Sequence, residues 1–289
     1  MEPTATFFVT TARSGTQWLA QALVANCPDG ARIEHEPVGY LYAPRKTLRD
    51  PEALRALPVD PRIEDHFTSV SRTLAGGRPY VETGFPAFAL YPLLKERFGE
   101  ALRIVHLVRE PVRVAASLTT HGWYVPGRRS DIEESVALTP SDPGFTLTKY
   151  AAAWPDMPPF EKCLFFWYEV HRYGLELEET VAPDRFARFR LRGLTTDPGE
   201  MARLLHFTGL SVRSDLRKMQ DKKVDRYSAK SSERIDWKAI GKYPEILALA
   251  ERFGYSLDEL DPRTLASRYQ RSRLRAFAGA VKRRLVAAH

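Results

Sequence analysis

The sequence has few cysteines and no long hydrophobic run. Its two cysteines, Cys27 and Cys163, are far apart and show no metal-ligand spacing, which argues against a disulfide scaffold and against a zinc site. No run of about 18 uncharged apolar residues occurs, so we expect no membrane-spanning helix. The N-terminus lacks the positively charged start of a signal peptide. Together these absences predict a cytoplasmic protein that needs no metal.

Acidic residues are in deficit, and the formal net charge is +7. A basic surface attracts nucleic acids, membrane phosphates or a small polyanion. No arginine-rich stripe with interleaved aromatic residues occurs, so a nucleic-acid partner is not expected. Much of the excess charge lies in residues 268–284, inside a basic helix expected over residues 264–287. This helix would pack on the domain or, as the alternative, make weak contact with an anionic membrane surface.

Short runs of β-branched and aromatic residues alternate with stretches in which apolar residues recur at the spacing of a helix. Strands are expected over Thr6–Thr10, Ala31–Glu34, Tyr80–Thr83, Ala101–Val108 and Arg185–Leu191. Strands separated by helices predict an α/β fold, a three-layer sandwich with a central parallel sheet, in a single domain spanning residues 1–289. Two stretches of weaker pattern, residues 40–77 and 122–159, are expected to form binding loops or lids. Trp123 and Tyr124 in the second stretch are candidates to line a substrate pocket.

The segment Thr11–Leu19, which we call the anion motif, lies between the first expected strand and the first helix. Backbone N–H groups of such a loop point into one concavity at the positive end of the helix dipole, which suits an anion. Gly15 lets the backbone approach the anion, and Arg13 adds a charge with forked donors. Further donors are Ser14, Thr16 and Gln17. The Gly-Lys pair of the usual nucleotide P-loop is absent, which argues against an ordinary ATP or GTP hydrolase. The alternative is a plain Ser-Gly turn that caps a helix.

A second motif follows the strand expected at Ala101–Val108. Arg109 stands at the carboxyl end of this strand, where α/β folds bind ligands. Pro111 suits the first turn of a helix, and Ser117 would then lie about two turns into it. An arginine paired with a hydroxyl suits a second phosphate, distinct from the group bound by the anion motif.

These two motifs resemble those of the sulfotransferases that use 3′-phosphoadenosine 5′-phosphosulfate (PAPS). The resemblance implies a P-loop-like fold in which Arg13–Trp18 hold the 5′-phosphosulfate, with Trp18 able to stack on adenine. It also implies that Arg109 and Ser117 hold the 3′-phosphate, and that the product is 3′-phosphoadenosine 5′-phosphate (PAP). Weaker similarity continues through Thr195–Leu210 and Ser231–Lys238, so that it spans roughly residues 5 to 245.

The sequence departs from this family at two places. Leu191-Arg192 stands where the family often has an aromatic-acidic pair, and the C-terminal Arg-Lys-Gly element of the small-molecule branch is missing. Lys230 is a candidate replacement for a ligand from that element. Which residues of the C-terminal half contact the nucleotide is therefore left open by the sequence.

Transfer to a hydroxyl needs a base that removes its proton and positive groups that stabilise the leaving phosphate, a task that suits Arg13. Glu36, Glu82 and His121 are the candidate bases. The branches of the family that act on sugars and on protein tyrosines place a base glutamate just after the second strand. This chain resembles them, because Glu36 stands at that position. The small-molecule branch has a histidine where this chain has Gly84. We therefore favour Glu36, which should stay ionised near neutral pH beside the cationic Arg13.

The glutamate pattern favours a carbohydrate or a small-molecule natural product as the acceptor. One alternative is a P-loop kinase, which would need the missing lysine and an acidic magnesium ligand. Another is a catalytically inactive protein that still binds the nucleotide.

Overall fold

The computed structural model describes residues 2–26, 30–211, 215–221 and 230–270. Within these residues, five parallel strands form one sheet in the order β2-β3-β1-β4-β5. The strands are β1 (Ala5–Val9), β2 (Arg32–Glu34), β3 (Tyr80–Glu82), β4 (Leu102–Val108) and β5 (Phe186–Arg190). Each lies within one residue of the range expected from the sequence. The predicted α/β fold with a central parallel sheet is confirmed.

The two central strands bury side chains on both faces of the sheet. In β1, Phe7 packs into one hydrophobic cluster and Phe8 into the other. In β4, Ile104 packs into the same cluster as Phe7, and Val105 packs into the same cluster as Phe8. Because successive side chains of a strand point to opposite faces, this division requires helices on both sides of the sheet.

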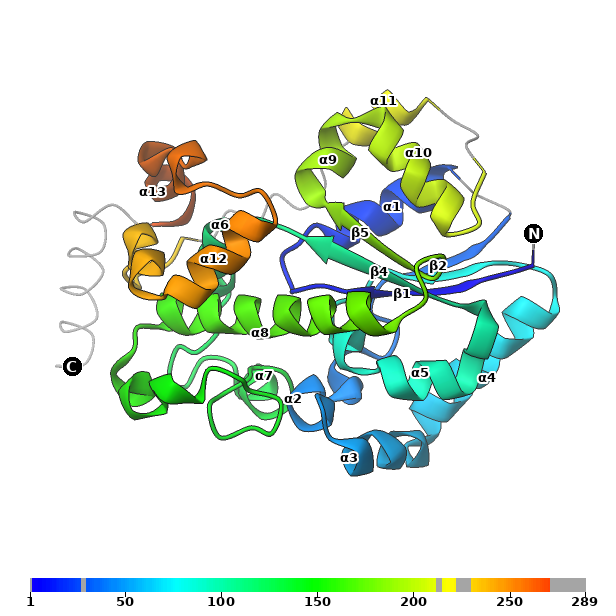
Figure 1. Cartoon of the computed structure of the whole chain (residues 1–289), viewed down its shortest axis with the longest axis horizontal. Coiled ribbons are helices and arrows are strands. Elements are labelled where there is room, and N and C mark those ends of the chain that lie inside the picture. Colours follow the sequence, from blue (N-terminus) through cyan, green and yellow to red (C-terminus); the bar gives the residue numbers. More distant parts are fainter. Residues whose placement is uncertain (1, 27–29, 212–214, 222–229, 271–289) are drawn as a thin grey trace, which may run out of the picture.

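The helices cover the sheet from both sides, which gives the expected three layers (Figure 1). On one side lie α1 (Thr16–Asn26), α9 (Leu191–Thr196), α10 (Pro198–Phe207) and α11 (Leu216–Asp221). The other side holds the larger cluster and α2 (Pro44–Thr47), α3 (Pro51–Ala56), α4 (Pro61–Ala75), α5 (Tyr91–Phe98), α6 (Pro111–Thr120), α7 (Ser130–Ser135) and α8 (Pro159–Thr180). To that cluster also belong α12 (Pro244–Arg252) and α13 (Pro262–Tyr269).

Of the two stretches expected to be loops or lids, residues 40–77 are largely helical, whereas residues 122–159 combine two short helical segments with turns; both pack into the larger cluster. Residues 40–77 contribute Tyr42 and Phe67 to it, both almost fully buried. Trp123 and Tyr124 are also buried there, so they are part of the core rather than an open pocket wall. The stretches are tied to each other by Arg45, whose guanidinium Nε lies 2.9 Å from a carboxylate oxygen of Asp142 and which also donates to the carbonyl of Glu133. The apolar residues of these segments therefore serve packing.

Other expectations fall partly outside the described residues. Cys163 is a buried free thiol, and Cys27 lies outside the described residues. The described part of the expected C-terminal helix is α13, whereas residues 271–289 lie outside. No helix in the described ranges combines the length and apolar character needed to cross a membrane.

Candidate active site

The carboxyl ends of the parallel strands meet at one edge of the sheet, and the segments that follow them carry the expected site residues. The anion motif follows β1, Glu36 follows β2, Gly84 follows β3 and Arg109 follows β4. Contacts across these segments include the hydrogen bond that the Thr83 hydroxyl donates to the Thr16 carbonyl, at 3.1 Å. Residues far apart in the sequence are thus brought to one edge, as α/β folds place their ligand sites.

The anion motif adopts the tight turn that an anion site requires. Arg13 has a φ of 66° and Gly15 a φ of 83°, so the chain enters the left-handed region twice within three residues. The Thr11 and Ser14 hydroxyl oxygens lie 2.7 Å apart and fix the turn from within. The left-handed backbone at position 15 favours glycine, and a Cβ there would lie 2.7 Å from a methyl carbon of Leu191, so that side chain would have to move. The turn leads directly into α1 at Thr16.

Arg13 and Arg109 are connected with Ser117 in one cluster. Arg13 Nε donates to the Ser117 hydroxyl at 3.1 Å, and Arg109 Nη1 donates to the Arg13 carbonyl. The Trp167 indole N–H donates to the Arg109 carbonyl at 2.8 Å and thereby anchors the end of β4. Glu110 caps α6 by accepting from the N–H groups of residues 112 and 113. Two guanidinium groups held in this way form a cationic region at the edge of the sheet.

The other members of the anion motif differ in exposure. Ser14 and Thr16 are buried, and the Thr16 hydroxyl lies 3.2 Å from Nε2 of His35, whose pKa burial lowers. Gln17 is exposed. Trp18, expected to offer its ring to adenine, is only 8% exposed and packs in the smaller hydrophobic cluster. In the structure this ring supports α1 against the sheet, which leaves little of it for a base to stack on.

Glu36 lies in a strained turn beside the anion motif. Its φ is 52°, an uncommon value for a glutamate and one that recurs at functional sites. Burial raises the pKa of this carboxyl to about 7, with the charge of Glu82 acting in the same direction. A hydrogen bond from the Phe85 backbone and the charge of Arg13 act in the opposite direction. Our expectation that Glu36 stays ionised near neutral pH is thus wrong: burial outweighs the attraction of Arg13 and raises the pKa to about 7.

Gly84 explains why a glutamate can occupy this place. A Cβ at position 84 would lie 2.8 Å from Glu36 Cγ and 2.9 Å from Glu36 N. The side chain of Glu36 therefore occupies the space into which a side chain at position 84 would project. The glutamate after β2 and the glycine after β3 are sterically linked.

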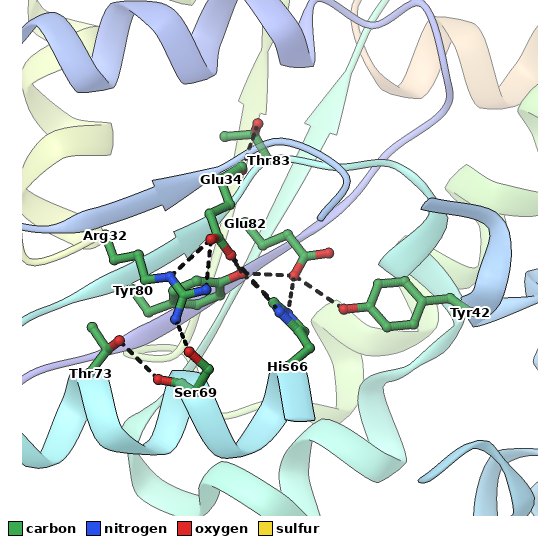
Figure 2. A network of polar contacts seen from close by, with 9 residues as sticks. All are labelled: Arg32, Glu34, Tyr42, His66, Ser69, Thr73, Tyr80, Glu82 and Thr83. Carbon is green, nitrogen blue, oxygen red and sulfur yellow. Dashed lines mark hydrogen bonds and ion pairs between the residues drawn. The ribbon is translucent and has the colours of Figure 1, made fainter. Parts of the chain in front are cut away.

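Glu82 is enclosed in a network of polar contacts (Figure 2). Its Oε2 lies 3.2 Å from the Tyr42 hydroxyl, 3.1 Å from His66 Nε2 and 3.0 Å from the Tyr80 hydroxyl. The Tyr80 hydroxyl also lies 2.9 Å from a carboxylate oxygen of Glu34, so its one proton is shared between two carboxylates. The Glu82 side chain has no exposed surface, and its Oε1 has no hydrogen-bond partner within the described ranges. A carboxylate enclosed in this way is suited to influence Glu36 and poorly placed to meet an acceptor.

His121, the third candidate base, follows α6 at its C-terminal end. Its Nδ1 lies 2.7 Å from the carbonyl oxygen of Ser117, so that ring nitrogen is used within the helix end. The choice between Glu36, Glu82 and His121 as base stays a prediction, and the geometry favours Glu36.

Replacing Glu82 by glutamine should shift the pH dependence of catalysis. Removing the negative charge that raises the pKa of Glu36 lets the carboxyl lose its proton at lower pH. Because a base works when deprotonated, the rise of kcat/KM with pH should move to lower pH. The measurement is a pH profile of both proteins, with PAP affinity as the control for folding. An unchanged profile would show that Glu82 does not act on the catalytic base.

The structure adds residues that sequence reasoning missed. Arg190 ends β5 and pairs in register with Val108, the residue that precedes Arg109. Its position at a strand end was a signal in the sequence comparable to that of Arg109.

Tyr269, at the end of α13, interacts electrostatically with Arg109, and no local pattern marked it. Lys230 is exposed and precedes Ser231, whose N–H donates to the Tyr269 carbonyl at 2.9 Å. Its role as a nucleotide ligand stays a prediction.

Solved structures that are similar to this chain include three sulfotransferases or sulfotransferase domains. The sulfotransferase domain of the Synechococcus PCC 7002 olefin synthase is 17% identical with a TM-score of 0.49, over 88% of this chain and 95% of that chain. The sulfotransferase domain from the curacin biosynthetic pathway is 17% identical with a TM-score of 0.46, over 94% and 99%. A sulfotransferase from Alicyclobacillus acidocaldarius is 15% identical with a TM-score of 0.49, over 89% and 98%. No protein-family model and no curated protein matches the chain.

Proposed function

We propose that this protein is a sulfotransferase that moves the sulfuryl group of PAPS to an acceptor hydroxyl. The observation that carries the proposal is the cluster in which Arg13 bonds Ser117 while Arg109 bonds the backbone of Arg13. This cluster connects the turn of the anion motif with a second cationic position. A nucleotide that carries phosphate groups at both its 5′ and 3′ ends needs two such positions. Glu36, with a pKa of about 7, stands beside it.

The residues divide the reaction between them. Glu36 accepts the proton of the acceptor hydroxyl while that oxygen attacks sulfur in line. The bond between sulfur and the bridging phosphate oxygen breaks, and the negative charge that develops there is stabilised by Arg13 and the N–H groups of the anion motif. A base with a pKa near the working pH combines a sizeable deprotonated fraction with proton affinity. The products are the sulfated acceptor and PAP.

The substrates follow from the same arrangement. Arg13, Ser14, Gly15, Thr16 and Gln17 would bind the 5′-phosphosulfate through side chains and backbone N–H groups, and Arg109 with Ser117 the 3′-phosphate. The acceptor class we propose is a carbohydrate or a small-molecule natural product, from the placement of Glu36 after β2. Gly84 supports the placement of Glu36, because its missing side chain makes room for that glutamate.

A kinase that uses ATP is less well supported. The anion motif has no lysine after its glycine, so the usual contact with the transferred phosphate is missing. A protein that binds the nucleotide without turning it over would show the same binding and no transfer to any acceptor.

Titration calorimetry with PAP and AMP, without magnesium, tests the proposal. A charge-assisted contact to the 3′-phosphate is worth roughly 1.5–3 kcal/mol, so PAP should bind about 10–100-fold more tightly than AMP. The Arg109→Ala variant should lose most of this preference. Arg103→Ala is the matched control, because Arg103 lies at the other end of the same strand and bonds the carbonyl of Glu100. Equal affinity of the wild type for PAP and AMP would refute the proposed function, and ATP with magnesium would then be the ligand to test.

A further inference from the structure

The Tyr269 hydroxyl is buried and has no hydrogen-bond partner among the described residues. The residue is only 5% exposed. Buried hydroxyl groups are nearly always hydrogen-bonded, because leaving such a group unpaired costs folding free energy. An exception of this kind calls for an explanation, and a ligand that accepts the hydrogen bond is one.

The position of Tyr269 is fixed from several directions. Its carbonyl accepts from the Ser231 N–H at 2.9 Å, and Ser231 and Gln270 form a parallel bridge. The Gln270 side chain donates to the Ile235 carbonyl at 3.0 Å. The ring itself packs in the larger hydrophobic cluster, and α13 lies against α6, the helix that carries Ser117. The hydroxyl is therefore held in place rather than left at a frayed helix end.

Tyr269 belongs to a set of groups that lie close to Arg109. Burial lowers the pKa of Arg109, and Tyr269 is the first of the neighbouring groups that act on it. The others are Arg268, Glu110 and Arg13. Glu110 is the one carboxylate in this set, and its oxygens already accept from the first N–H groups of α6. Near Arg109, hydrogen-bond donors thus outnumber acceptors, and a bound anion would supply the missing acceptors.

We propose that the Tyr269 hydroxyl donates a hydrogen bond to the 3′-phosphate of the bound nucleotide, beside Arg109 and Ser117. This inference rests on the proposed function and adds to it a residue from the C-terminal part of the chain. The Arg268 guanidinium lies 5.5 Å from the centre of the Tyr269 ring, and its charge also acts on Arg109.

The test is calorimetric titration of the full chain with PAP and AMP, on the wild type and on Tyr269→Phe. A hydrogen bond to a charged group predicts that Tyr269→Phe weakens PAP binding by about tenfold or more and leaves AMP binding unchanged. Tyr255→Phe is the matched control, because Tyr255 is also a buried tyrosine near Arg109, but its hydroxyl donates to the Val108 carbonyl at 3.1 Å. This control should keep the ratio of PAP to AMP affinity.

The possible outcomes separate the two proposals. If the wild type prefers PAP and Tyr269→Phe retains the whole preference, the assignment of Tyr269 is overturned while the proposed function stands. A variant that weakens PAP and AMP equally would show a purely structural role and also overturn the assignment. If the wild type has no preference for PAP, the proposed function itself fails. The unfolding temperature without ligand should not fall in Tyr269→Phe, since no hydrogen bond within the described chain is lost.

Discussion

Replacing Glu36 by glutamine should lower the rate of sulfuryl transfer by about 10²–10⁴-fold, the usual contribution of a positioned general base. Glutamine has nearly the same shape but cannot take up the acceptor proton. PAP affinity should be unchanged, because the nucleotide phosphates are assigned to the anion motif, Arg109 and Ser117. Transfer is measured as PAP released from PAPS with a panel of hydroxyl acceptors, and PAP affinity by calorimetry.

The pH dependence gives this prediction a second readout. Burial raises the pKa of Glu36 to about 7, and the base works when deprotonated. In the wild type, kcat/KM should therefore rise with pH, with its midpoint near 7, and level off above it. Glu36→Gln should lose this rise. His121→Gln, which changes another candidate base, should keep both the rate and the profile. If His121→Gln loses the rise and Glu36→Gln keeps it, the base is His121.

Replacing Gly84 by alanine should lower transfer by about 100-fold, although Gly84 itself has no side chain and takes no part in the chemistry. The added Cβ would lie 2.9–3.0 Å from the backbone N and Cα of Glu36, closer than such atoms approach. Because these are backbone atoms, the turn that carries Glu36 must move. A displacement of about 1 Å at a catalytic group can cost this much in rate.

The control for Gly84→Ala is Gly241→Ala. A Cβ at position 241 meets no atom of the described residues within 4 Å and the backbone there is not left-handed, so this variant should transfer sulfate at the wild-type rate. PAP affinity should be retained in both variants, which separates a displaced base from a misfolded protein. Full activity in Gly84→Ala would mean that Glu36 can move without loss, and it would argue against Glu36 as the base.

The sequence by itself determined the sheet and most of the candidate site. The strand at Leu102–Val108 is a continuous apolar run apart from Arg103 and His106, and Pro111 begins the helix after it. Such signals are local, because strand propensity, the glycine of a turn and a proline at a helix start depend on neighbouring residues. The alternation of strands and helices then places the loops after the strands at one edge of the sheet. Arg13, Glu36 and Arg109 could be expected at that edge for this reason.

Only the tertiary structure decided how these groups behave. The pKa of Glu36 depends on its burial and on Glu82, which follows it by 46 positions. The fit between Gly84 and Glu36, the burial of Trp18 and the approach of Tyr269 to Arg109 likewise join distant segments. Desolvation and steric exclusion act between atoms that are close in space, and a linear pattern does not contain those distances. The sequence therefore determined which chemical groups reach the edge of the sheet, and packing decided their charge, their accessibility and their partners.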